Sequence, residues 1–201
     1  MPFSASKMTE YILAKASQSK MGGQKMQPMI SAVSSAVCSY LPKAAEVSST
    51  NLVLGPGNGT YRGTLTGCSP STMGSLMASK GQSQGLSSQE IKKFFNAISF
   101  GVCQILSGSV TAQGNVIGGG KGSGQGKITS LSQSELQQRI LSFLKGKKFL
   151  GGKTEALASA ISFGICNHIM GDIKVLTTCT GYINNWGGRS YRSVPGPGHL
   201  V

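Results

Sequence analysis

Apolar residues recur with a helical period in some segments of the chain. In other segments they form short runs that are typical of β-strands. Near 91–102 and 136–144 they recur every three or four residues, which is the spacing of one helix face. Ser132 with Glu135 fits a capping box at the start of the second of these segments. Short runs rich in Val, Thr and Leu lie within 51–65, separated by glycines that permit a tight reversal. The pattern predicts helix, helix and β-hairpin.

The same pattern occurs three times. The heptapeptides AVSSAVC, AISFGVC and AISFGIC end at Cys38, Cys103 and Cys166, which are 65 and 63 residues apart. A match of this length at nearly equal intervals indicates an internal repeat. The sequence therefore predicts an α+β fold of three divergent units, each made of two helices followed by a β-hairpin. The units either stack side by side or surround a pseudo-threefold axis.

Unit boundaries follow from the positions of the heptapeptides and the glycine-rich segments. We expect three units and an extended C-terminal arm, at 1–70, 71–131, 132–194 and 195–201. Pro195 and Pro197 argue against a helix or a central strand in the last segment. This segment is therefore expected to be either disordered or an extended arm that lies on a neighbouring subunit.

Charge is scarce but one-sided. Charged residues make up 12% of the chain, about half the usual fraction, so its surface is weakly protected against association. Nineteen Lys and Arg against six Asp and Glu give a net charge of +13, spread along the whole chain. This favours a generally basic surface over a dedicated nucleic-acid groove, and an aromatic content of 6% argues against a base-stacking platform.

Nothing at the start of the sequence resembles a signal peptide, and no apolar run approaches the roughly 20 residues that cross a membrane. We therefore expect no contact with a membrane. Five cysteines without a signal peptide are typical of synthesis in a reducing cytosol.

The repeat cysteines Cys38, Cys103 and Cys166 lie at the end of apolar helical stretches, where cysteine behaves as a small buried hydrophobe. We expect them to be buried, reduced and free of metal. A three-thiolate metal site is the alternative, although no CxxC pair supports it. Cys68 and Cys179 lie in strand regions and could pair if the chain is oxidised, but the sequence does not decide whether they do.

Three features that suggest chemistry have simpler interpretations. The glycine-rich run 118–127 lacks the spacing of a phosphate-binding loop. His168 follows Cys166 on a helix face that is expected to be buried, which disfavours a Cys–His nucleophile. Most of the acids fall in first turns of helices, where a carboxylate complements the helix dipole. The sequence therefore predicts no catalytic residue, no metal, no cofactor and no enzymatic activity.

The glycine-rich hairpin tips and the C-terminal arm are the predicted contact surfaces, because ordered glycine needs neighbours that immobilise it. They carry basic side chains that would complement acidic patches on partner subunits. The candidate contact residues are Arg62, Lys121, Lys127, Arg189, Pro195 and Pro197.

A helix that ends in Ala-Ile-Ser-x-x-Val-Cys, followed by a polar segment and a glycine-rich strand region, resembles small virion structural proteins of tailed bacteriophages. The resemblance implies a non-enzymatic assembly subunit of the tail, baseplate, neck or capsid. It also implies synthesis in the host cytoplasm, location in the virion, and other virion proteins as partners in a symmetric assembly of multiple copies. The alternative is a basic nucleic-acid-binding or packaging-associated protein.

Overall fold

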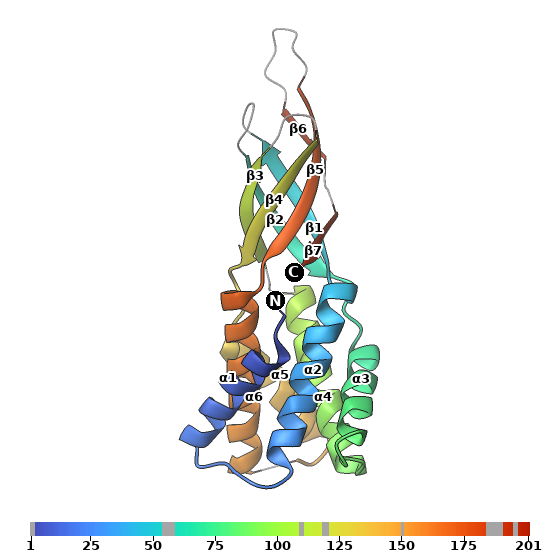
Figure 1. Ribbon diagram of the computed structural model, residues 1–201, viewed down its shortest axis with the longest axis vertical. Coiled ribbons are helices and arrows are strands. Elements are labelled where there is room, and N and C mark those ends of the chain that lie inside the picture. Colours follow the sequence, from blue (N-terminus) through green and yellow to red (C-terminus); the bar gives the residue numbers. More distant parts are fainter. Residues whose placement is uncertain are drawn as a thin grey trace.

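The chain forms an elongated molecule with helices at one end and strands at the other, as the computed structural model in Figure 1 shows. The backbone is described for residues 3–53, 59–108, 111–117, 121–149, 151–183, 191–194 and 197–201. Side chains are described for residues 3–45, 65–107, 126–149, 151–176 and 200–201.

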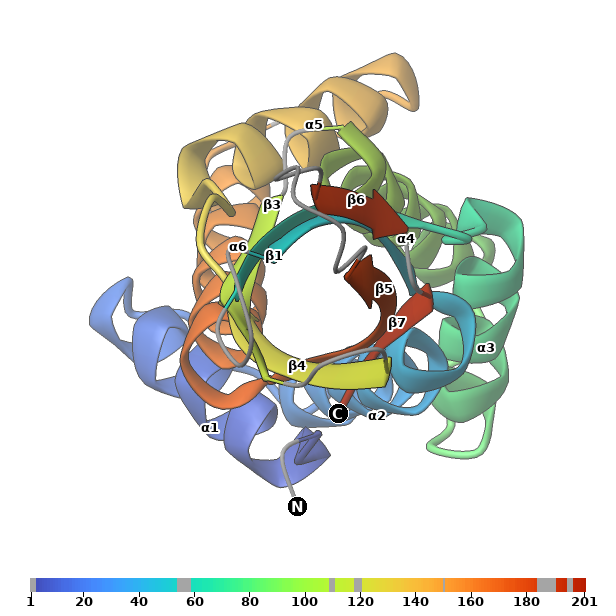
Figure 2. The ribbon, with the colours of Figure 1, turned by 90° about the horizontal axis from the view of Figure 1, so that it is seen from above.

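Six helices of the described chain form one bundle: α1 Ala5–Gln18, α2 Met26–Ala44, α3 Pro70–Gln82, α4 Gln89–Gly108, α5 Gln133–Gly146 and α6 Gly152–Asp172. Seen along the long axis, α1, α3 and α5 lie outside, while α2, α4 and α6 lie beneath the sheet (Figure 2). Each of these inner helices leads into a strand. The three helix-to-helix turns therefore lie at the end of the bundle that is far from the sheet (Figure 1).

The strands are β1 Glu46–Val53, β2 Gly59–Thr66, β3 Thr111–Ile117, β4 Lys121–Ile128, β5 Val175–Ile183, β6 Tyr191–Val194 and β7 Pro197–Leu200. They pair antiparallel in the order β4-β3-β2-β1-β7-β5, and β5 pairs back with β4. The sheet thus closes into a ring, which Figure 2 shows end-on. β6 pairs with the far half of β5.

The predicted fold class, α+β with three units that each end in a β-hairpin, is wrong. Helices account for 72% of the residues whose side chains are described, and the strands are short. Moreover, the strands do not stand as separate hairpins, because β2 pairs with β3, β4 pairs with β5, and the last section contributes three strands. A lone hairpin is marginally stable in water, whereas a closed sheet leaves few backbone groups unpaired. The molecule is mainly helical, with one core and one closed sheet.

The predicted C-terminal arm is also wrong for residues 197–201. β7 pairs with β1 on one side and with β5 on the other, and thereby closes the sheet. Lys174 and Val201 exchange two backbone hydrogen bonds of 2.9 Å beyond the end of β7. Pro197 is the first residue of β7, a position at which a strand tolerates proline. Pro195 lies outside the described residues.

The helices share one hydrophobic core, and two glycines set how closely they approach. A Cβ added at Gly164 in α6 would lie 2.9 Å from the backbone nitrogen of Ile12 in α1. A Cβ added at Gly101 in α4 would lie 2.7 Å from Cγ1 of Ile140 in α5. Both pairs of helices are therefore packed too closely for a larger residue at these two positions.

Candidate basic interface

The three helix-to-helix turns at the far end of the bundle are built in the same way. Lys20, Gly85 and Lys148 each adopt a left-handed backbone conformation, with φ of 51°, 79° and 63°. In each turn the next backbone N–H donates to a carbonyl five residues earlier, with distances of 2.9–3.1 Å: Met21 to Ala16, Leu86 to Gly81, and Phe149 to Leu144. This is a Schellman motif, which satisfies carbonyls at the end of a helix.

Backbone stability alone would place glycine at all three left-handed positions. A left-handed conformation costs an L-residue about 1–2 kcal/mol, and glycine is the usual residue at this place in the motif. Gly85 follows this rule, whereas Lys20 and Lys148 do not. The stability of the turns therefore does not account for these two lysines.

Nine exposed lysines lie on these turns and on the adjoining helix ends. They are Lys20, Lys25, Lys80, Lys92, Lys93, Lys145, Lys147, Lys148 and Lys153. The acids among them are Glu90 and Glu155, which leaves a surplus of seven positive charges out of the net +13 of the chain. We call the end of the bundle that carries these nine lysines the basic end.

Helix dipoles explain only part of the basic end. Lys80 and Lys145 lie in the last turns of α3 and α5, where a cation is stabilised by the helix dipole. Lys25, by contrast, is the N-cap residue of α2 and makes no capping hydrogen bond through its side chain. Lys153 lies in the first turn of α6. Cations are unfavourable at these positive helix ends, so folding alone does not favour Lys25 and Lys153.

The basic end is poor in internal partners. The ion pairs between described residues are Lys7–Asp172, Arg139–Glu135 and His168–Asp172, and none of them involves a lysine of the basic end. The aromatic rings nearby are largely covered, and Phe149 is half-buried against the core. Phe94 and Phe95 are buried, and the ammonium of Lys147 lies 5.7 Å from the ring centre of Phe143. The lysines are thus available to an external anion.

The repeat cysteines lie in equivalent helices, and their predicted burial is confirmed. Cys38, Cys103 and Cys166, in α2, α4 and α6, are 7%, 2% and 2% exposed. Burial raises the pKa of the Cys38 and Cys166 thiols to about 12, which keeps both protonated and unreactive near neutral pH. The prediction that all three are reduced is wrong, because Cys103 forms a disulfide.

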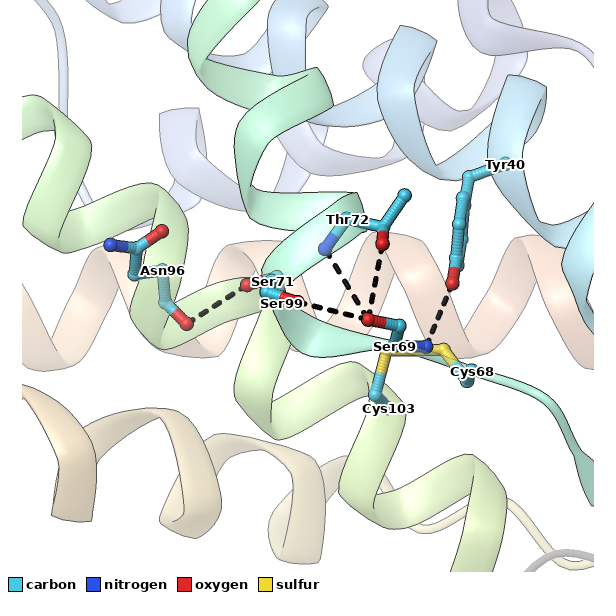
Figure 3. The surroundings of a disulfide bond; sticks show 8 residues. All are labelled: Tyr40, Cys68, Ser69, Ser71, Thr72, Asn96, Ser99 and Cys103. Carbon is cyan, nitrogen blue, oxygen red and sulfur yellow. Dashed lines mark hydrogen bonds between the residues drawn. A yellow bond between two sulfur atoms is a disulfide. The ribbon is translucent and has the colours of Figure 1, made fainter.

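The disulfide joins Cys103 to Cys68, with a Cα–Cα distance of 5.2 Å (Figure 3). Cys68 lies in the connection between β2 and α3, so the bond fixes that connection to α4. Next to it, the backbone N–H of Ser69 donates to the hydroxyl of Tyr40 at 2.7 Å. The Ser69 hydroxyl in turn accepts from the backbone N–H of Thr72 and caps α3. The pairing of Cys68 with Cys179, which the sequence left open, is therefore excluded.

The predicted contact residues do not all lie at hairpin tips. Lys121 is the first residue of β4 and Lys127 is its last residue but one. At the rise per residue of an extended strand, their Cα atoms are about 20 Å apart. Lys127 is exposed on the side near the helices, so its expected position at a hairpin tip is wrong. Arg62 lies within β2, and Gln113 of β3 pairs in register with both Arg62 and Lys127. Arg189, like Pro195, lies outside the described residues.

One ionisable cluster lies at the opposite end of the bundle, between α1 and α6. The Asp172 carboxylate accepts from Lys7 and lies 3.1 Å from Nδ1 of His168, and Tyr11 donates to it at 3.4 Å. Burial lowers the pKa of His168, and contacts with Asp172 offset this effect only in part. Burial opposes the ionisation of Asp172, yet hydrogen bonds from Lys7 and His168 outweigh it and lower the pKa of the carboxyl. His168 is fully buried, so it is a packing residue of the helix interface.

Within the described ranges, no three His, Cys, Asp or Glu side chains are arranged to hold a metal ion. In the same part of the chain, no helix is both long and apolar enough to cross a membrane. Comparison with known proteins found no matching family model, curated protein or solved structure.

Sequence reasoning missed the basic end because the lysines are spread over 20–153 in the chain. The signal was nevertheless present. Each predicted helix-to-helix turn is flanked by lysines, and helices that pair antiparallel bring alternate turns to the same end of a bundle. The charge counted at each predicted helix-to-helix turn therefore indicates the cluster, whereas the charge summed along the chain does not.

Proposed function

We propose that this protein is a non-enzymatic structural subunit that attaches to a larger assembly through the basic end of its helical bundle. The observation that carries the proposal is the gathering of nine exposed lysines at one end of an elongated molecule. Several of them occupy backbone positions that disfavour lysine. Lysines at such positions are explained better by binding outside the chain than by folding.

The assembly we propose is the virion of a tailed bacteriophage. The support is the resemblance of the heptapeptides and glycine-rich strand regions to small virion proteins of these phages. In this role the chain is made in the host cytoplasm, enters the particle in multiple copies and contacts other virion proteins. A basic, packaging-associated nucleic-acid-binding role is the second candidate, and the same gathering of lysines favours it.

The test of this function is the presence of the chain in purified particles. Virus particles from the source culture are purified on a density gradient, and the chain is quantified by mass spectrometry against the major capsid protein. We expect a fixed copy number through the particle peak. A chain that remains in the soluble fractions, with none in the particle peak, would overturn the proposal.

A matched pair of charge reversals tests the attachment surface. One variant changes Lys25, Lys93 and Lys148 to Glu, and the control changes Lys43, Lys127 and Lys174, which are exposed at or near the sheet, to Glu. Like charges brought together at an interface cost several kcal/mol, so incorporation of the first variant is expected to fall at least about tenfold. The control is expected to incorporate normally. Equal losses for the two variants would contradict attachment through the basic end.

A further inference from the structure

We infer that the basic end binds the phosphate backbone of double-stranded nucleic acid without reading its sequence. The inference deepens the proposed function, because it names what the basic end contacts. It rests on the proposed function in one respect, namely that the basic end is the surface by which the chain attaches to its assembly. The partner is defined by its chemistry, which is a dense and regular array of phosphates.

The kind of cation at the basic end favours phosphate over an acidic protein surface. All nine basic residues there are lysines, and none is an arginine. Arginine pairs with carboxylates and phosphates alike in a fixed bidentate geometry, but it is enriched at protein–protein interfaces, whereas lysine is depleted there. A lysine ammonium is a flexible point charge that can follow a phosphate backbone without a fixed register.

The surroundings of the lysines favour a duplex over a single strand. Proteins that hold single strands stack bases on exposed aromatic rings. Near the basic end, Phe94 and Phe95 are buried, the Lys147 ammonium lies over the ring of Phe143, and Phe149 is half-buried against the core. The rings described at this end therefore offer little free surface on which bases could stack. The lysines can still reach backbone phosphates, which a duplex presents on its outside.

The spread of the lysines also suits a polymer better than a small anion. They come from three turns at separate places around the bundle, whose outer helices surround the inner ones in Figure 2. Helices about 10 Å thick, packed in this way, place the turns on a face roughly 20–30 Å across. A single phosphate or carboxylate meets only one turn on such a face. A duplex carries about one charge per 1.7 Å of its axis and can meet several turns at once.

Binding of this kind has a quantitative consequence. Each phosphate that a lysine neutralises releases condensed counterions, and the slope of log K against log salt concentration changes by about −0.9 per contact. Contacts from about six of the nine lysines would give a slope near −5. Binding through phosphates alone also predicts equal affinity for duplexes of different sequence.

The experiment uses fluorescence anisotropy with the full chain and labelled DNA duplexes of about 30 base pairs and different sequences, over a range of salt concentrations. One variant changes Lys25, Lys93 and Lys148 to Gln, which removes one cation from each turn. The control changes Lys43, Lys127 and Lys174 to Gln and has the same net charge. Circular dichroism verifies that both variants fold. Polyglutamate of matched charge serves as the acidic-protein probe.

We expect the chain to bind every duplex with similar affinity. The slope of log K against log salt concentration should become less negative by about 2–3 in the basic-end variant and by less than about 1 in the control. Equal slopes for the two variants, tighter binding of polyglutamate than of duplex, or no duplex binding at low salt would each overturn the inference. If the chain is found in particles but does not bind duplex, the inference fails and the proposed function stands. If the chain binds duplex but is absent from particles, the proposed function fails and the inference stands.

Discussion

At the scale of single residues, the buried His168 makes stability depend on pH. Its pKa is lowered in the folded chain by burial, so the folded state binds a proton less readily than the unfolded state does. The stability that the neutral ring contributes is present above the ordinary pKa of about 6.5 and is lost as pH falls toward the lowered folded value. Asp172, whose pKa is also lowered, adds a further loss only below its ordinary 3.8.

We therefore expect the free energy of unfolding to decrease from pH 7.5 to pH 5, by up to about 1.4 kcal/mol for each unit by which the pKa of His168 is lowered. Urea denaturation at a series of pH values measures this. His168→Phe removes the titrating group and should flatten the curve over that interval, whatever its effect on overall stability. A curve for this variant that is as steep as that of the native chain would show that another group titrates.

The left-handed lysines give a second prediction at this scale. Because glycine adopts positive φ without strain, Lys20→Gly and Lys148→Gly should each raise the free energy of unfolding by about 0.5–1 kcal/mol. The reciprocal control is Gly85→Lys in the third turn, which should lower it by about 1 kcal/mol. Both effects are measured by urea denaturation. Destabilisation by both glycine variants would mean that these lysines contribute to folding, and would remove this support for the basic end as a binding surface.

At the scale of elements, the contact between α1 and α6 depends on Gly164. Gly164→Ala would push a Cβ against the backbone of Ile12 and should destabilise the chain by about 1–3 kcal/mol. Gly171→Ala in the same helix meets no atom within 4 Å and should stabilise it by about 0.5–1 kcal/mol through helix propensity. Thermal unfolding of the two variants checks this. A similar shift of Tm in both would contradict the close packing.

The disulfide links two other elements, the β2–α3 connection and α4. It spans a sequence separation of 35 residues, and closing a loop of this length is expected to stabilise the folded state by about 3–4 kcal/mol. Cys68→Ser, or reduction of the native chain, should therefore lower the free energy of unfolding by that amount. A reducing agent should have no further effect on Cys68→Ser. A native chain whose unfolding is the same with and without reductant would show that the bond is absent in solution.

Local elements were easier to predict than their assembly. The heptapeptides fall in α2, α4 and α6, and Ser132 caps α5 by accepting from the backbone N–H of Glu135, as the sequence indicated. Both depend on spacing within a few residues. The disulfide and the closing strand β7 depend on contacts between segments far apart in the chain, such as Cys68 with Cys103, for which no local pattern gives a signal.

At the scale of the whole molecule, the basic end arises from topology. Lysines that are distant in sequence meet because the three helix pairs all turn at the same end of the bundle (Figure 1). The sequence predicted a generally basic surface, whereas the structure brings nine of the lysines together at one end of the bundle. The opposite end of the bundle carries the closed sheet, so the two ends of the molecule differ in structure.

The most direct test of the account is lysine footprinting of the chain within its assembly. Surface lysines are acetylated in the free chain and in purified particles, and the extent of modification is compared by mass spectrometry. Lys20, Lys25, Lys93 and Lys148 should be protected in particles, while Lys43, Lys127 and Lys174 remain as reactive as in the free chain. Protection of the second group, with the basic end still fully reactive, would contradict attachment through the basic end.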